Sequence, residues 1–170
     1  RKISKYFDID DDQISKLEQK ISLIINKSFY SNSQLIDNFL KDFPIAINPQ
    51  RLIDMIEDYF NELISNNEID FESILVFSNK LLADSNFSKQ ICEKCKYLFV
   101  DEFQDISKLQ FEIFYKLGSN GTFLNVVGDP AQSIYKFRGG DSDSFNWFEE
   151  LDQTEMFTLP INYRSFKGLV

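Results

Sequence analysis

The sequence predicts an α/β protein in which a helical region precedes a parallel β-sheet. Three observations lead to this prediction. Apolar residues recur at helical spacing across residues 1–90, a continuous apolar run occupies 97–100 and mainly apolar runs occupy 123–127 and 156–159, and a helical stretch separates the first two runs. Continuous apolar runs are typical of parallel strands buried on both faces. Strands that alternate with helices are the pattern of α/β folds.

Two stripes of apolar residues define the main helices of the first half. They comprise Ile14, Leu17, Ile21, Ile24 and Ile25, and then Leu52, Ile53, Ile56, Tyr59, Phe60 and Leu63. This spacing places each set on one helix face, so we expect both sets to form a core. Breaks near 31–33, 43–49 and 65–67 separate the helices, and a further helix is expected from Asp70 to Leu82. The acidic run 8–12 lacks the glycine and terminal glutamate of a calcium loop and indicates a solvated helix start.

The second half alternates between expected strands and helices. In chain order these are a strand at Tyr97–Val100, a helix from Ser107 to Leu117 closed by Gly118, a strand at Phe123–Val127, a short helix, a helix near Ser142–Leu151, and a third strand at Met156–Leu159. Parallel sheets place their ligands at the carboxyl ends of the strands. We therefore expect the functional residues to lie directly after each of these three strands.

Charge and composition exclude several kinds of chemistry. The 170 residues hold 27 Asp and Glu against 18 Lys and Arg, a net charge of −9, and contain no histidine. A Ser-His-Asp triad, a Cys-His dyad and a histidine-ligated zinc or haem are excluded. The acidity is spread along the chain, so any nucleic-acid contact must come from local basic and stacking aromatic residues. No apolar run approaches the length of a membrane span, and we expect a soluble, cytoplasmic protein with no membrane partner.

The two cysteines form a lone C-x-x-C at Cys92 and Cys95. A structural zinc or iron–sulfur site needs about four soft ligands, and this sequence offers no others. We therefore predict two ordinary reduced thiols.

The groups that follow the three expected strands suit one reaction. They are Asp101 and Glu102, then Asp129 with Gln132, and then Asn162-Tyr163-Arg164. One acid can hold magnesium through water, and an adjacent acid can activate a water that attacks a γ-phosphate. An arginine can neutralise the charge that develops on the phosphoryl group, and an amide can detect the γ-phosphate. Taken alone, the acid pair is equally consistent with a helix cap or a solvated loop.

Three ordered segments resemble motifs of the UvrD/Rep/PcrA-like superfamily 1 DNA helicases. Residues 100–105, with Gln110, are similar to motif II, residues 127–141 to motif III, and residues 159–165 to motif IV. The resemblance covers about Asp70 to Ser165. It implies that residues 70–170 form part of a RecA-like P-loop NTPase core (1A-like), and that residues 1–69 belong to a helical inserted subdomain (1B-like).

The resemblance implies a role for each nucleotide-site residue. Asp101 would coordinate magnesium through water, and Glu102 would activate the attacking water. Gln132 would contact the γ-phosphate and couple its presence to the DNA site. Arg164 would act as an arginine finger in cis, and Tyr163 would stack on the base. The implied cofactors are ATP and Mg²⁺.

The same resemblance implies a single-stranded DNA site at Tyr135, Phe137 and Arg138. The aromatic rings would stack on bases, and the arginine would contact phosphate or a ring. Many relatives carry tryptophan where Phe137 stands, and phenylalanine keeps a smaller stacking face. The alternatives are that the two aromatic residues belong to the core and that Arg138 is a surface salt-bridge partner.

No G-x-x-x-x-G-K-[ST] phosphate loop occurs among these 170 residues. We therefore expect a fragment of an ATP-dependent DNA helicase or translocase, which the resemblance implies to be 3′-to-5′, that is inactive alone. It would need the remainder of its motor, namely the P-loop and a second RecA-like domain, and would act on single-stranded DNA and duplex junctions. One alternative is a truncated or degenerate helicase module that binds DNA or protein. Another is a metal-dependent nuclease built on Asp101, Glu102, Asp105 and Asp129.

Overall fold

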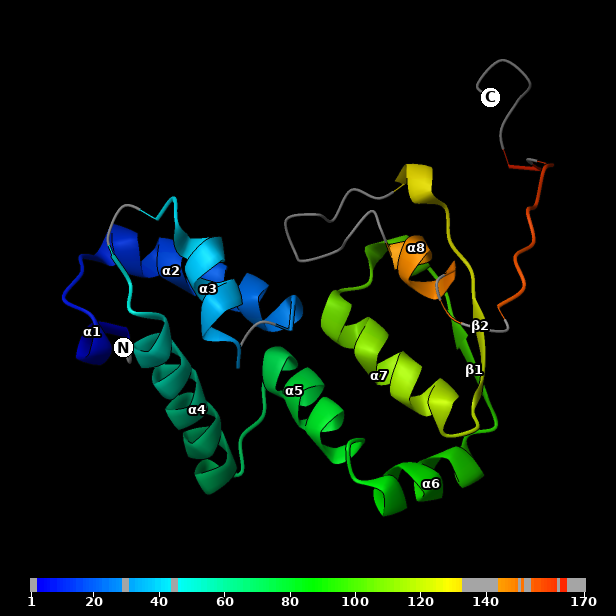
Figure 1. Ribbon diagram of the computed structural model, residues 1–170, viewed down its shortest axis with the longest axis horizontal. Helices are drawn as coiled ribbons and strands as arrows, with labels where there is room; N and C mark the ends of the chain where they lie inside the picture. The colour runs from blue at the N-terminus through cyan, green and yellow to red at the C-terminus, as the bar shows by residue number, and fades with distance from the viewer. Residues whose placement is uncertain are drawn as a thin grey trace.

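The structure is a computed structural model that describes residues 3–28, 31–43, 46–132, 144–149, 151, 154–161 and 163–164. Helices dominate its first half, and a two-stranded sheet with flanking helices follows (Figure 1). The first elements are α1 (Ile3–Tyr6), α2 (Asp11–Asn26), α3 (Ser33–Leu40), α4 (Pro49–Asn66), α5 (Phe71–Leu81) and α6 (Ser85–Lys94). They are followed by β1 (Tyr97–Val100), the 3₁₀ turn η1 (Phe103–Asp105), α7 (Lys108–Ser119), β2 (Phe123–Val126), the 3₁₀ turn η2 (Pro130–Gln132) and α8 (Ser144–Glu149).

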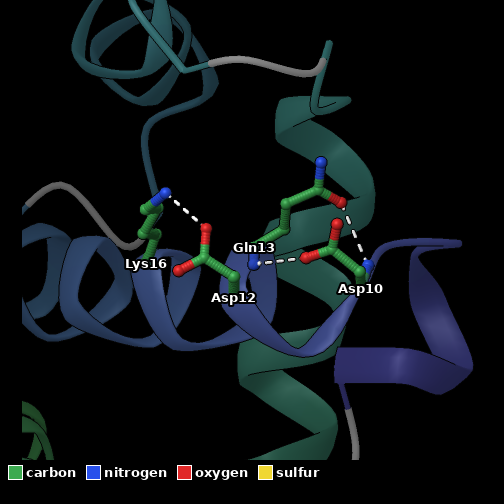
Figure 2. A network of polar contacts seen from close by, with 4 residues as sticks. All are labelled: Asp10, Asp12, Gln13 and Lys16. Carbon is green, nitrogen blue, oxygen red and sulfur yellow. Dashed lines mark hydrogen bonds and ion pairs between the residues drawn. The ribbon is translucent and has the colours of Figure 1, made fainter.

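Side-chain caps fix where the helices begin. The Asp10 carboxylate accepts a hydrogen bond from Gln13 N at 2.9 Å, and the Gln13 side chain accepts one from Asp10 N at 3.0 Å (Figure 2). Asp12 in the first turn also pairs with Lys16 one turn further on. This reciprocal capping box satisfies backbone N–H groups that have no partner within the helix. The acidic run at 8–12 is therefore a helix start, as the sequence predicts.

The main hydrophobic core lies among α1 to α5 and continues to α7. Leu17, Ile24, Leu52 and Ile36 are fully buried in it, so the two predicted apolar stripes do form a core. Val76 of α5 and Leu109 of α7 belong to the same cluster. The core thus continues past residue 70, and it joins the helical region to the part of the chain that carries the sheet.

Polar contacts also join α5 to α7. Asn79 is buried on α5, where its Nδ2 donates to Glu112 Oε2 at 3.1 Å and its Oδ1 accepts from Lys116 Nζ at 2.6 Å. A buried amide is tolerated when its donors and acceptors are paired, and charged partners strengthen such bonds. These contacts therefore fix the position of α7 relative to α5.

The strands β1 and β2 pair in parallel, with Tyr97 opposite Phe123 and Val100 opposite Val126. The helix α7 connects them and packs along one side of the pair (Figure 1). Both strands and the intervening helix agree with the sequence prediction. Because the first and last residues of the two strands pair with each other, the two carboxyl ends lie side by side. The backbone hydrogen bond from Val127 N to Val100 O at 2.8 Å continues the pairing beyond the strands.

The predicted burial of these strands on both faces is wrong. Tyr97 and Phe99 are 66% and 73% exposed, and Phe123 is also exposed, while Val100 and Val126 are half-buried against the cluster that contains Phe111 of α7. Only one face is covered by the elements that the structure describes. A continuous apolar run therefore did not distinguish a doubly covered strand from a strand with one open apolar face.

The predicted third strand at Met156–Leu159 is also not observed. Residues 154–161 have no regular secondary structure, and Met156, Phe157 and Leu159 are exposed. A strand needs a hydrogen-bonded neighbour, and β1 and β2 pair only with each other within the described chain. The helix expected near Ser142–Leu151 is present as the shorter α8.

Candidate functional site

The predicted acid pair lies at a sharp corner directly after β1. Glu102 adopts the left-handed conformation, with φ 52° and ψ 41°, and η1 begins at the next residue. Asp101 Oδ1 accepts a hydrogen bond from Glu102 N at 2.8 Å, and Asp105 N donates to Glu102 O at 2.9 Å. A non-glycine residue in this region costs on the order of 1–3 kcal/mol and tends to occur at functional sites. Both carboxylates are exposed at this corner.

The corner is held against the carboxyl end of β2. Phe103 N donates to Val127 O at 3.0 Å, so the chain after β1 bonds to the residue after β2. The Phe103 ring is fully buried and packs edge-on against Phe145 and Phe148 of α8, at centroid distances of 5.3 and 5.7 Å. The helix α8 therefore packs against the corner through these rings.

Gln104 links the two strand ends through its side chain. The amide is 2% exposed, its Nε2 donates to Glu102 Oε2 at 2.7 Å, and its Oε1 accepts from Asp129 N at 2.9 Å. No role for Gln104 is predicted from the sequence. The D-E-x-Q-D spacing was its only signal, because its partner Asp129 lies 25 positions away in the chain.

Gly128 allows this close approach. A Cβ atom at this position would overlap with Gln104 Oε1, and it would lie 2.9 Å from Phe103 N and 3.1 Å from the Phe145 ring. Only a residue without a side chain lets two backbones and a buried amide meet at this distance. Gly128 is thus a second residue of the site that the sequence analysis did not single out.

The turn after β2 brings Gln132 to the same edge. Asp129 Oδ1 accepts from Ala131 N at 2.9 Å, and Asp129 Oδ2 accepts from Gln132 Nε2 at 2.9 Å. The hydrogen bond from Gln132, followed by that from Ala131, holds the pKa of Asp129 below its ordinary value. Asp129 is therefore a turn residue that orients Gln132.

Two other predicted site residues lie further along the chain. Tyr163 is 89% exposed and Arg164 is also exposed. The third member of that group, Asn162, and the three predicted DNA contacts, Tyr135, Phe137 and Arg138, lie outside the described residues. Of the predicted nucleotide-site residues, Asp101, Glu102 and Gln132 are therefore linked across the two strand ends, and Gln104, which was not predicted, supplies the link.

A protein-built metal cage is absent from this region. Within the described ranges, no three histidine, cysteine, aspartate or glutamate residues are placed to hold a metal ion. The four carboxylates of the nuclease hypothesis therefore do not converge. One exposed aspartate is, however, the donor set typical of Mg²⁺, which keeps several waters and binds mainly through substrate phosphates. Asp101 fits that mode of binding.

Cys92 and Cys95 are free thiols, and each approaches a backbone carbonyl: Leu117 O at 3.4 Å and Tyr97 O at 3.5 Å. This agrees with the prediction of ordinary thiols.

None of the helices in the described segments is long and apolar enough to cross a membrane.

The fold and the site together define a class of protein. The chain is an α/β protein whose polar groups gather at the carboxyl edge of a parallel sheet, which is the usual position of a nucleotide site. The family model for the UvrD/REP helicase N-terminal domain matches residues 2–152. The chain belongs to the UvrD/Rep helicase family.

Individual relatives agree with this assignment. A probable DNA helicase II homolog of Mycoplasma capricolum is 36% identical over 117 residues, covering 66% of this chain and 16% of the relative. The ATP-dependent DNA helicase PcrA of Bacillus subtilis is 32% identical, covering 71% and 17%. The ATP-dependent DNA helicase srs2 of Schizosaccharomyces pombe is 31% identical, covering 78% and 15%. The chain therefore spans about one sixth of the length of these relatives.

Proposed function

We propose that this chain supplies the water-activating half of the nucleotide site of an ATP-dependent DNA helicase. One observation carries the proposal: the acid pair after β1 is tied through Gln104 to the turn that presents Gln132 after β2. The family model that matches residues 2–152 includes both segments, and relatives named as ATP-dependent DNA helicases match 71–78% of the chain. The proposal assigns the substrate as ATP and the track as single-stranded DNA, with movement in the 3′-to-5′ direction and unwinding of duplex junctions.

In the proposed mechanism Glu102 accepts a proton from the water that attacks the γ-phosphate. Its backbone corner and its bond from Gln104 fix the direction of the carboxylate, so the base does not reorganise during the reaction. Asp101 would hold Mg²⁺ through water, and the ion supplies charge neutralisation at the phosphates when it is bound.

Gln132 is suited to detect the γ-phosphate. Its side-chain amide has two N–H donors, of which one is directed at Asp129. The second can donate to a phosphate oxygen while the first keeps the side chain in place. We assign Arg164 to the charge on the phosphoryl group, Tyr163 to the base, and Tyr135, Phe137 and Arg138 to single-stranded DNA.

The proposal includes a larger polypeptide. A phosphate loop is needed to hold the β- and γ-phosphates, and these 170 residues contain no such sequence. We propose that the loop and a second RecA-like domain belong to the remainder of the protein, and that this chain alone does not hydrolyse ATP. Residues 1–69 would then be a helical insertion and residues 70–170 part of the RecA-like core, in a cytoplasmic DNA motor.

The test is the ATPase rate of the full-length protein with and without single-stranded DNA, beside a Glu102→Gln variant. General-base catalysis contributes about 10²- to 10⁴-fold, so the variant should lose at least 100-fold in kcat and keep its affinity for the nucleotide. Hydrolysis that is stimulated by DNA and lost in the variant supports the motor. A full-length protein with no hydrolysis above that of the variant would instead favour a helicase module retained for binding DNA or protein.

A further inference from the structure

Gln104 has a buried side-chain amide whose nitrogen and oxygen are both hydrogen-bonded. Its neighbours Asp101 and Glu102 are exposed, whereas Gln104 is 2% exposed and lies between the two strand ends. Burying an amide costs free energy unless its donors and acceptors are paired. The pairing observed here is with one group from each strand end, a carboxylate oxygen and a backbone N–H.

Only one orientation of the amide satisfies both partners. The Glu102 carboxylate can only accept, so it requires the Nε2 group, and Asp129 N can only donate, so it requires Oε1. The bond to a charged carboxylate is of the stronger, charge-assisted kind, in keeping with its length of 2.7 Å. A hydrocarbon side chain of equal length would fill the space but would make neither bond.

The position of the amide is fixed by its surroundings. It lies against Gly128, where even a methyl group would overlap with Oε1. Its own backbone lies in η1, whose first residue is the bonded and fully buried Phe103. Because the amide cannot move independently of β2, the direction of the Glu102 carboxylate depends on the carboxyl end of β2 as well as on β1.

We propose that Gln104 is a positioning residue for Glu102 and sets the orientation of the water-activating carboxylate relative to the turn that carries Gln132. This inference rests on the proposed function, because it assumes that Glu102 is the base. It predicts that removing the Nε2 donor lowers the rate of hydrolysis without changing nucleotide binding.

Two variants of the full-length protein remove this amide donor and differ in charge and in whether they keep an acceptor for Asp129 N. Gln104→Glu keeps an oxygen that can accept from Asp129 N and places a second oxygen against Glu102. Gln104→Met keeps the length and introduces no charge. The matched control is Gln13→Glu, in which the Gln13 oxygen that accepts from Asp10 N at 3.0 Å is retained in the capping box of α2.

We expect both Gln104 variants to lose at least tenfold in DNA-stimulated kcat, with KM for ATP and the affinity for a fluorescent nucleotide changed less than threefold. Gln13→Glu should keep both constants within twofold. If Gln104→Glu does not fold, as judged by urea unfolding, Gln104→Met decides. A folded Gln104 variant that keeps kcat within twofold, or that loses activity only through KM, would overturn the proposal.

The Glu102→Gln variant in the same assay separates the two proposals. If Glu102→Gln retains hydrolysis, the assignment of the base is wrong and the positioning role fails with it. If Glu102→Gln abolishes hydrolysis while both Gln104 variants keep it, the motor stands and the positioning role of Gln104 alone is wrong.

Discussion

Replacement of Gly128 by alanine should destabilise the chain through one steric conflict at the junction of the two strand ends. The added Cβ would overlap with Gln104 Oε1 and lie 2.9 Å from Phe103 N, a backbone atom that is itself bonded to Val127 O. Overpacking of this kind costs about 1–3 kcal/mol, and the loss of the bond from Asp129 N to Gln104 adds about 1 kcal/mol. We expect the free energy of unfolding to fall by about 2–4 kcal/mol.

Urea unfolding followed by circular dichroism measures this loss. With an m-value of about 2 kcal/mol/M, the midpoint of Gly128→Ala should be lower by about 1–2 M. The matched control is Gly118→Ala on α7, where the new Cβ would lie 2.8 Å from Leu124 Cδ1, the end of a flexible side chain. Alanine favours a helix over glycine by about 1 kcal/mol, which offsets the displacement, so the control should change by less than about 1 kcal/mol.

The reasoning would be refuted if Gly128→Ala unfolded within about 0.5 kcal/mol of the parent chain. It would also be refuted if both glycine variants lost the same amount, because the loss would then reflect a general intolerance of added volume.

Two further predictions concern the helical half. Leu17→Ala removes a fully buried side chain and should cost about 2–5 kcal/mol, whereas Phe71→Ala, at an 85% exposed position, should change the urea midpoint little; equal losses would contradict the assigned core. Burial acts to raise the pKa of Asp70, but hydrogen bonds from Tyr59 and Ser73 outweigh it and hold the pKa below its ordinary value. The stability that Asp70 contributes is thus present above its unfolded pKa of about 3.9 and is lost as the pH falls through the folded pKa. When urea midpoints are measured from about pH 2 to 7, the midpoint of Asp70→Asn should therefore fall less steeply at acid pH than that of the parent chain. An equally steep fall would contradict the assignment.

The helices were predictable because local sequence determines them. Asp10, Asn48 and Ser107 cap their helices with side chains that recognise backbone N–H groups three positions away, and these signals are visible in the sequence. The order and parallel pairing of the two strands followed from the apolar runs and the intervening helix. What could not be predicted was which faces of the sheet are covered, because Tyr97 and Phe99 are as apolar as residues of a buried strand.

The residues of the site divide in the same way. Asp101, Glu102 and Gln132 were predictable because their chemistry and their place after an apolar run are both local properties. The linking role of Gln104 and the need for glycine at 128 were not, since both arise from the contact of segments 25 positions apart. That contact exists only once the register of β1 and β2 is fixed.

The geometry of the acid pair therefore depends on tertiary contacts and not on the local sequence alone. The left-handed backbone of Glu102 costs on the order of 1–3 kcal/mol, and such a conformation persists only where the surroundings over-determine it. Here the surroundings include the bond from Phe103 N to Val127 O, the bond from Gln104 to Asp129 N, and the burial of the Phe103 ring against α8. Each of these contacts depends on β2 or on residues that follow it. Isolated residues 97–110 would keep the D-E-x-Q-D sequence and lose its geometry, so the orientation of Glu102 follows from the paired strands.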